Sequence, residues 1–272
     1  MPSTFLHKTD DIWCTEMIDF LQQSGERENY SLADRLEKCA IYRRNGLRSD
    51  KVPNYCNLRF LCRSCSERIA KRKAKQFSAI IQELMFRLDL IPFMLTLKPK
   101  SSYSLSLALS QLETHLQKIR HRRKNHSSGR STFTEFCRPQ YLLLAIEIIR
   151  TQDHREWFPH IHALALNPSE EPHFVFPSLF QEWEEISGSP VRPHVKGTNA
   201  GRTFQKLQRS IVASSVQAKV SRQLRTVIEY PLKPPELCPQ DRLIVYNTIK
   251  NKNLIRQWRV TEGRCFRPFN RL

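Results

Sequence analysis

The stretch from Trp157 to Leu166 constrains the fold more than any other part of the chain. It is largely apolar and carries His160 and His162, two positions apart. Side chains on a strand alternate between faces, so both imidazoles point to the same face of a sheet. The apolar run from Tyr141 to Ile149 predicts a neighbouring strand. The sequence therefore predicts a sheet with two histidines on one face.

The two histidines form half of a metal site, and a carboxylate on the neighbouring strand can complete it. Glu147 is the one carboxylate between Tyr141 and Ile149, and it becomes the third ligand if the two strands pair. Two imidazoles and one carboxylate leave coordination positions open, as catalytic metal sites do. Mixed nitrogen and oxygen ligands suit Mn²⁺ well and Mg²⁺ less, although cellular abundance favours Mg²⁺. The alternative is a pair of partly exposed histidines without a metal.

The charge of the chain points to a polyanionic partner. Lys and Arg number 44 against 26 Asp and Glu, a formal net charge of +18 over 272 residues. Such a field concentrates nucleic acid, and counterion release strengthens its binding. The competing class, a basic protein on a membrane surface, needs a long amphipathic helix, and we find no clear example. No segment has the length of a membrane span, and the start of the chain lacks the apolar core of a signal peptide. We expect a cytoplasmic DNA-binding protein.

Four of the eight cysteines form a cluster in the sequence. They are Cys39, Cys56, Cys62 and Cys65, with the spacing C-x16-C-x5-C-x2-C. In a reducing compartment cysteines are thiols or metal ligands more often than disulfides, and the final C-x2-C pair is typical of half a zinc knuckle. The spacing predicts a structural zinc ion held by four thiolates. Buried thiols without a metal are the alternative.

Two basic segments are candidates for DNA contact. A predicted helix from Ser66 to Leu88 carries positive charges in its first half, on Arg68, Lys71, Arg72, Lys73 and Lys75. Next to a metal-binding segment these side chains suit phosphate contact, and a solvated helix face is the alternative. The segment from Arg120 to Arg130 reads as an exposed loop that either contacts DNA or is simply solvated.

The C-terminal third contains the candidate nucleophile. Residues 203–229 have the apolar spacing of one or two helices that run into Tyr230 and Pro231. Proline disfavours a helical conformation in the residue before it, so Tyr230 is predicted at or near the end of its helix. A last basic helix is predicted from Asp241 to Trp258.

In this order the elements resemble the rolling-circle replication initiators of small plasmids, in the HUH endonuclease superfamily. The resemblance extends from Cys39 to Lys233. The strand Met94–Lys98 looks like the family's first motif, Pro-His-Ile-His at 159–162 like the core of the second, and Tyr-Pro-Leu-Lys at 230–233 like the third, Tyr-x-x-Lys. The resemblance implies that Tyr230 is the nucleophile and that Lys233 assists it.

The sequence departs from the family at one functional position. Some members have a glutamate four residues before the tyrosine, thought to activate the second nucleophile in termination, and this chain has Thr226 there. Glu229 is adjacent to the tyrosine, but neighbouring helical residues face different directions. The departure therefore affects the acid–base step of termination and not the first cleavage.

The chemistry also follows from the residue types. A free phenol has a pKa of about 10 and needs assistance to attack a phosphodiester at neutral pH. A divalent ion on His160, His162 and Glu147 can polarise the phosphate and align it with Tyr230, and Lys233 can neutralise developing charge. The alternatives are a tyrosine that packs on the core at a helix end and a solvated lysine.

The predicted fold class is α+β: an HUH-type central antiparallel sheet flanked by helices, with an N-terminal zinc-binding segment built on the four clustered cysteines. Residues 1–90 are expected to form the helical, zinc- and DNA-binding segment, and residues 91–272 the nicking-joining domain. The expected function is to nick single-stranded origin DNA and start rolling-circle replication of a plasmid-like element, followed by a host helicase and polymerase. The alternatives are a single-tyrosine transposase or relaxase, and a non-catalytic zinc-dependent DNA-binding protein.

Overall fold

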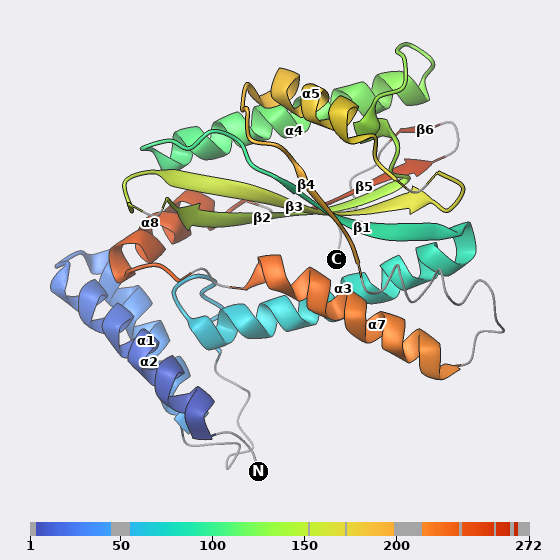
Figure 1. Ribbon diagram of the computed structural model, residues 1–272. Helices are drawn as coiled ribbons and strands as arrows, with labels where there is room; N and C mark the ends of the chain where they lie inside the picture. The colour runs from blue at the N-terminus through green and yellow to red at the C-terminus, as the bar shows by residue number, and fades with distance from the viewer. Residues whose placement is uncertain are drawn as a thin grey trace. The chain divides into compact units, whose positions relative to one another are not determined.

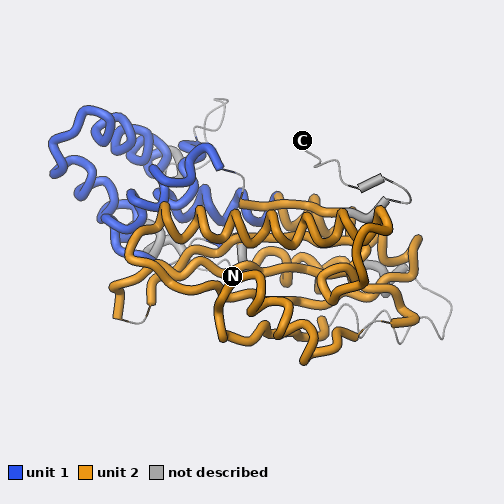
Figure 2. Tube along the Cα trace, turned by 90° about the horizontal axis from the view of Figure 1, so that it is seen from above, with its two compact units in different colours: residues 1–72, 233–252 blue, residues 73–232, 253–272 orange. Residues whose placement is uncertain are grey.

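The chain forms two compact units. The structure, a computed structural model, describes residues 4–44, 55–151, 153–171, 173–198, 214–233, 236–252, 254–261 and 264–265. One unit contains residues 1–72 and 233–252, and the other contains residues 73–232 and 253–272 (Figure 2). The predicted division into residues 1–90 and 91–272 has a single boundary. The compact units have more than one boundary, because the C-terminal segment 233–252 belongs to the same unit as residues 1–72.

The first unit is helical. Its elements are α1 (Thr4–Gln23), α2 (Arg27–Arg44), the first turns of α3 (Arg63–Leu88) and α8 (Pro239–Ile249). Arg242 of α8 is buried, its guanidinium lies 3.9 Å from the centroid of the Trp13 ring, and it donates to the Trp13 carbonyl and to Glu16 at 3.1 and 3.3 Å. This buried charge is satisfied by α1, which explains why α8 belongs to the N-terminal unit.

The second unit is built on an antiparallel sheet. Its strands are β1 (Leu90–Leu97), β2 (Tyr141–Arg150), β3 (Trp157–Pro168), β4 (His194–Gly197), β5 (Ile255–Thr261) and β6 (Arg264–Cys265). Among the described residues they lie in the order β4-β1-β3-β2-β5-β6, and every recorded pairing is antiparallel. The predicted α+β class with an antiparallel sheet is confirmed.

Helices cover both faces of this sheet (Figure 1). On one face lie α4 (Leu105–Ser127) and α5 (Phe176–Ser187), and α7 (Ser214–Glu229) lies on the other, followed by the 3-10 turn η2 (Tyr230–Leu232). Another 3-10 turn, η1, spans Glu135–Cys137. Residues 203–213 of the predicted helical region lie outside the described residues. No helix in the described ranges is long and apolar enough to cross a membrane.

Two sequence predictions about these elements are wrong. The segment from Arg120 to Arg130 is not mainly a loop, because α4 continues to Ser127. Arg123 anchors this extension: it is buried, and its guanidinium donates to the carbonyls of Phe136 and Pro139. The last helix, predicted from Asp241 to Trp258, ends at Ile249, and Trp258 lies on β5.

Candidate functional site

The candidate catalytic residues lie on one face of the sheet in the second unit. The register pairs Glu147 of β2 with His160 of β3, and Thr96 of β1 with His162. Residues directly opposite in an antiparallel pair share a face, so all four side chains are on the same side. The predicted pairing of the two strands is confirmed, and it brings the carboxylate to the two histidines.

The His162 ring is held on both sides. Its Nε2 lies 2.8 Å from Glu147 Oε2, and its Nδ1 lies 3.3 Å from Thr96 Oγ1. These contacts come from the two strands that flank β3, so the ring position is set by the sheet. A ligand placed on a paired strand is more precisely oriented than one on a loop.

His160 has a different environment. It is 6% exposed, its ring centroid lies 4.5 Å from that of Phe158, and its Nε2 is buried without a hydrogen-bond partner. The pKa of His160 is lowered to about 4, mainly by burial and also by the charge of Lys98, against the opposing effect of Glu147. The imidazole is therefore neutral at pH 7 and keeps a free nitrogen lone pair, as a metal ligand requires.

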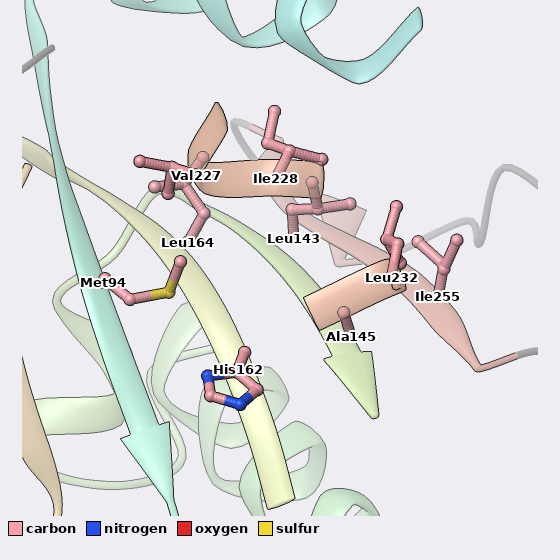
Figure 3. A pocket seen from close by; sticks show the side chains of 9 residues that line it. All are labelled: Met94, Leu143, Ala145, His162, Leu164, Val227, Ile228, Leu232 and Ile255. Carbon is pink, nitrogen blue, oxygen red and sulfur yellow. The ribbon is translucent and has the colours of Figure 1, made fainter. Parts of the chain in front are cut away.

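Tyr230 lies next to His162 on the histidine face of the sheet. Its neighbours along the chain, Ile228 and Leu232, are buried and line a small apolar pocket against the sheet together with His162 (Figure 3). Tyr230 itself is 61% exposed, and its ring centroid lies 5.9 Å from that of His162 at an interplanar angle of 88°. Because α7 ends at Glu229, the prediction of Tyr230 at a helix end is confirmed. Buried residues on either side fix the turn and leave the phenol open to solvent.

The three predicted ligands match a divalent ion in their chemistry. The unpartnered Nε2 of His160 is a buried polar atom that a cation would satisfy, and His162 and Glu147 supply a second nitrogen and a carboxylate. In the described part of the chain, however, these three do not form a group of ligand atoms all within 4.8 Å of one another. A cation would have to draw them closer together.

The low pKa of His160 predicts acid sensitivity. An unfolded histidine takes up its proton near pH 6.5, before the folded one at about 4, so protons favour the unfolded chain in this window. This contribution is fully present above pH 6.5 and falls by about 3 kcal/mol toward pH 4. We expect the unfolding free energy of the His160→Gln variant to decrease less between pH 7 and pH 4 than that of the unmodified protein. Urea titrations at the two pH values measure both decreases. Equal losses would contradict the assignment.

The predicted cysteine ligands come together in the first unit. Cys39 is on α2, Cys56 is in the following loop, Cys62 directly precedes α3, and Cys65 lies in the first turn of α3. All four are buried, with sulfur atoms within 4.8 Å of one another, 3.7 Å between Cys39 and Cys65 and 3.5 Å between Cys56 and Cys65. Four sulfurs bound tetrahedrally at about 2.3 Å from zinc lie roughly 3.8 Å apart. This cluster can hold a metal ion such as zinc.

The loop between Cys56 and Cys65 is fixed by hydrogen bonds. Phe60 has φ of 75°, which is rare for a residue with a large side chain, and its N–H donates to Ser66 Oγ at 2.9 Å. Ser66 Oγ in turn donates to the Cys62 carbonyl at 2.8 Å. The sulfurs are therefore held in place by the backbone as well as by packing.

The ionisation of the cluster favours a bound cation. Hydrogen bonds from Cys56, Cys62 and Cys65 lower the pKa of the Cys39 thiol. The hydrogen bond to Cys39 and burial raise the pKa of the Cys62 thiol. A bound cation would compensate for the protons that these buried thiols give up as ligands. Metal binding here should release protons and weaken in acid.

The basic residues of α3 differ in exposure. Three of the five predicted DNA contacts are exposed: Lys71, Arg72 and Lys75. Arg68 instead lies 4.0 Å from the centroid of the Tyr55 ring and donates to the Asn57 side chain, so it supports the loop that carries Cys56. Lys73 Nζ lies 5.9 Å from the centroid of the Phe77 ring.

The remaining predicted residues follow α7 or lie on it. Lys233 is exposed directly after η2. Thr226 is exposed on α7, and its hydroxyl donates to the Arg222 carbonyl at 3.3 Å, so the position of the family's glutamate holds a helix-surface residue.

Sequence reasoning missed Thr96 and Lys98 as members of the site. Thr96 follows Met94 on β1 at an interval of two and pairs with His162, which places it on the histidine face, whereas Lys98 comes directly after β1 and acts on His160 through its charge. The signal was the strand alternation, but it becomes useful only once β1 is known to pair with β3.

Comparison of the chain with protein-family models, with curated proteins and with solved structures gives no match.

Proposed function

We propose that the protein is a metal-dependent, site-specific DNA endonuclease and strand transferase with Tyr230 as its nucleophile, acting as a replication initiator of the rolling-circle HUH type. The observation that carries the proposal is the position of Tyr230, exposed and with its ring 5.9 Å from that of His162, which is bonded to Glu147. Three separate segments thus bring a phenol, two imidazoles and a carboxylate to one face of the sheet, which supports the proposal.

Positive charges near His160 and next to Tyr230 in the sequence suit a phosphodiester. Lys98 lies close enough to His160 to lower its pKa, and Lys233 follows Tyr230 by three residues. Both positive groups can neutralise charge that develops on the phosphate oxygens. The net charge of +18 adds a general attraction for DNA.

In the proposed reaction the phenol oxygen of Tyr230 attacks the phosphorus. The bond from phosphorus to the 3′ oxygen breaks, the phenol gives up its proton, and the 3′ oxygen gains one. A divalent ion held by His160, His162 and Glu147 would supply Lewis-acid polarisation of the phosphate. The products are a 5′-phosphotyrosine link and a free 3′-hydroxyl, which conserve the ester for rejoining.

The cysteine cluster supports the second part of the proposal, a structural zinc ion that orders a DNA-binding segment. The cluster lies at the start of α3, and Lys71, Arg72 and Lys75 are exposed just beyond it on the same helix. Zinc would fix the helix start, and these charges would contact phosphate without reading sequence.

The test is to trap the covalent product. Purified protein, Mn²⁺ and a pool of labelled single-stranded oligonucleotides are resolved on a denaturing gel, and the adduct is digested for mass spectrometry. We expect the nucleotide on the peptide that contains Tyr230. An adduct on another residue would reject the nucleophile. DNA binding without metal-dependent cleavage of any sequence in the pool would favour the non-catalytic alternative.

Removing both histidines should abolish the metal-dependent reaction without unfolding the protein. We expect His160→Ala with His162→Ala to weaken Mn²⁺ binding by at least about 100-fold and to stop cleavage, because two of three ligands are lost. The fold should persist with some loss of stability, since His160 Nε2 has no partner to lose but His162 gives up its contacts with Glu147 and Thr96. Calorimetric titration and thermal unfolding measure the two effects, with His121→Ala on α4 as control. Cleavage by the double variant would remove the metal site.

A further inference from the structure

Thr96 touches His162 from the side opposite to Glu147. Its Oγ1 lies 3.3 Å from Nδ1, while Glu147 Oε2 lies 2.8 Å from Nε2. Thr96 and His162 are direct partners in the β1–β3 register, so the sheet itself sets this contact. Each ring nitrogen therefore has its own partner from a different strand.

We propose that Thr96 is a positioning residue that holds the His162 imidazole in orientation for metal binding through Nε2. The inference rests on the proposed function and adds a residue that neither the cysteine spacing nor the histidine pair indicates. Metal-binding histidines commonly need a partner on the second ring nitrogen, which fixes the tautomer and the ring plane.

A hydroxyl is well suited to this position because it both donates and accepts hydrogen bonds. Without a metal, the Nε2–H of a neutral His162 donates to Glu147, and Nδ1 accepts from the Thr96 hydroxyl. Metal binding through Nε2 requires its lone pair, so the ring proton must then be on Nδ1, where it is donated to Thr96 Oγ1. The ring exchanges one proton with solvent at each nitrogen and keeps its net charge. Thr96 provides a partner in both states.

The competing explanation is that Thr96 is only a β-branched residue that packs well on a strand. Two substitutions separate shape from hydrogen bonding. Thr96→Val keeps the branched shape and removes the hydroxyl, whereas Thr96→Ser keeps the hydroxyl and removes a methyl group. Thr96→Ala, which also lacks the hydroxyl, replaces the valine variant if that one does not fold.

The first measurement is Mn²⁺ affinity by calorimetry on full-length, zinc-loaded protein. We expect Thr96→Val to weaken binding about 10- to 100-fold, the usual effect of losing an outer partner of a ligand, and Thr96→Ser to restore it to within about threefold. Equal affinity of the valine variant and the unmodified protein would overturn the proposal. Equal losses in the serine and valine variants would also overturn it, since packing would then explain both.

The second measurement reads the proton directly. In ¹⁵N-histidine spectra, with the His162 signals assigned from a His162→Gln variant, we expect the ring proton to move from Nε2 to Nδ1 when Mg²⁺ is added. If the proton stays on Nε2 while metal is bound at His162, the role of Thr96 is rejected but the proposed metal site is not. Metal binding that survives the double substitution of His160 and His162 rejects the proposed metal site as well.

Discussion

Tyr230→Phe should eliminate the covalent DNA adduct and lower the nicking rate by at least about 1,000-fold, because a phenyl ring has no oxygen to attack the phosphorus. The residue is 61% exposed, and its buried neighbours Ile228 and Leu232 hold the turn in place without it. Folding and DNA affinity should therefore change little, since surface substitutions usually alter stability by about 0.5 kcal/mol or less. Adduct yield, nicking rate and DNA affinity are measured on the same preparations.

A second exposed tyrosine provides the matched control. Tyr103, just before α4, is 77% exposed, and Tyr103→Phe removes the same hydroxyl from the same unit. We expect this variant to form the adduct at the normal rate. Normal cleavage by Tyr230→Phe would contradict the assignment of the nucleophile. Loss of activity in both variants would point to a general effect of removing a surface hydroxyl.

Local patterns in the sequence predicted the parts of the site that lie within one element or between neighbouring elements. Alternation placed His160 and His162 on one face, and β2 and β3 pair as consecutive strands usually do. Cys56, Cys62 and Cys65 converge because a loop of few residues leads directly into α3, and Cys39 of α2 meets them. These features depend on few residues and short chain separations.

Features that depend on distant contacts were not predictable in this way. The region from Asp241 to Trp258 was assigned to one helix, yet β5 pairs with β2, where Gln257 accepts from the Tyr141 hydroxyl at 2.8 Å. Arg256 of β5 forms an ion pair with Glu113 on α4. The local composition of β5 carries no information about its partners Tyr141 and Glu113, yet these tertiary contacts decide that the segment is a strand.

Charge patterns gave the second type of error. The arginines and lysines between Arg120 and Arg130 predict an exposed loop, because charged residues are mostly exposed. Arg123 is buried instead, since two backbone carbonyls satisfy its guanidinium. The predicted contact of Arg68 with phosphate stays a prediction, although in the fold its guanidinium lies over the Tyr55 ring. A sequence shows the charge of a side chain but not the acceptors that the fold brings to it.

Replacing one thiolate of the cluster should cause the largest loss of stability in the first unit. Cys62→Ser is expected to lower the zinc content of purified protein and to cost at least several kcal/mol of unfolding free energy, because structural zinc binding contributes about 10 kcal/mol or more to folding in small domains. Cys62 is fully buried beside Cys39, Cys56 and Cys65, so a serine would leave both an incomplete metal site and a buried hydroxyl. Metal analysis and thermal unfolding measure the two effects.

Cys14 separates the loss of a ligand from the loss of a buried sulfur. It is buried in the same hydrophobic cluster but is not among the four mutually close sulfurs. Cys14→Ser should therefore cost about 1–3 kcal/mol, as a buried polar replacement does, and leave the zinc content unchanged. Chelation should destabilise the Cys14 variant and the unmodified protein alike but have little further effect on Cys62→Ser. A folded protein that contains no zinc, and is indifferent to chelators, would show that the four thiols pack without a metal.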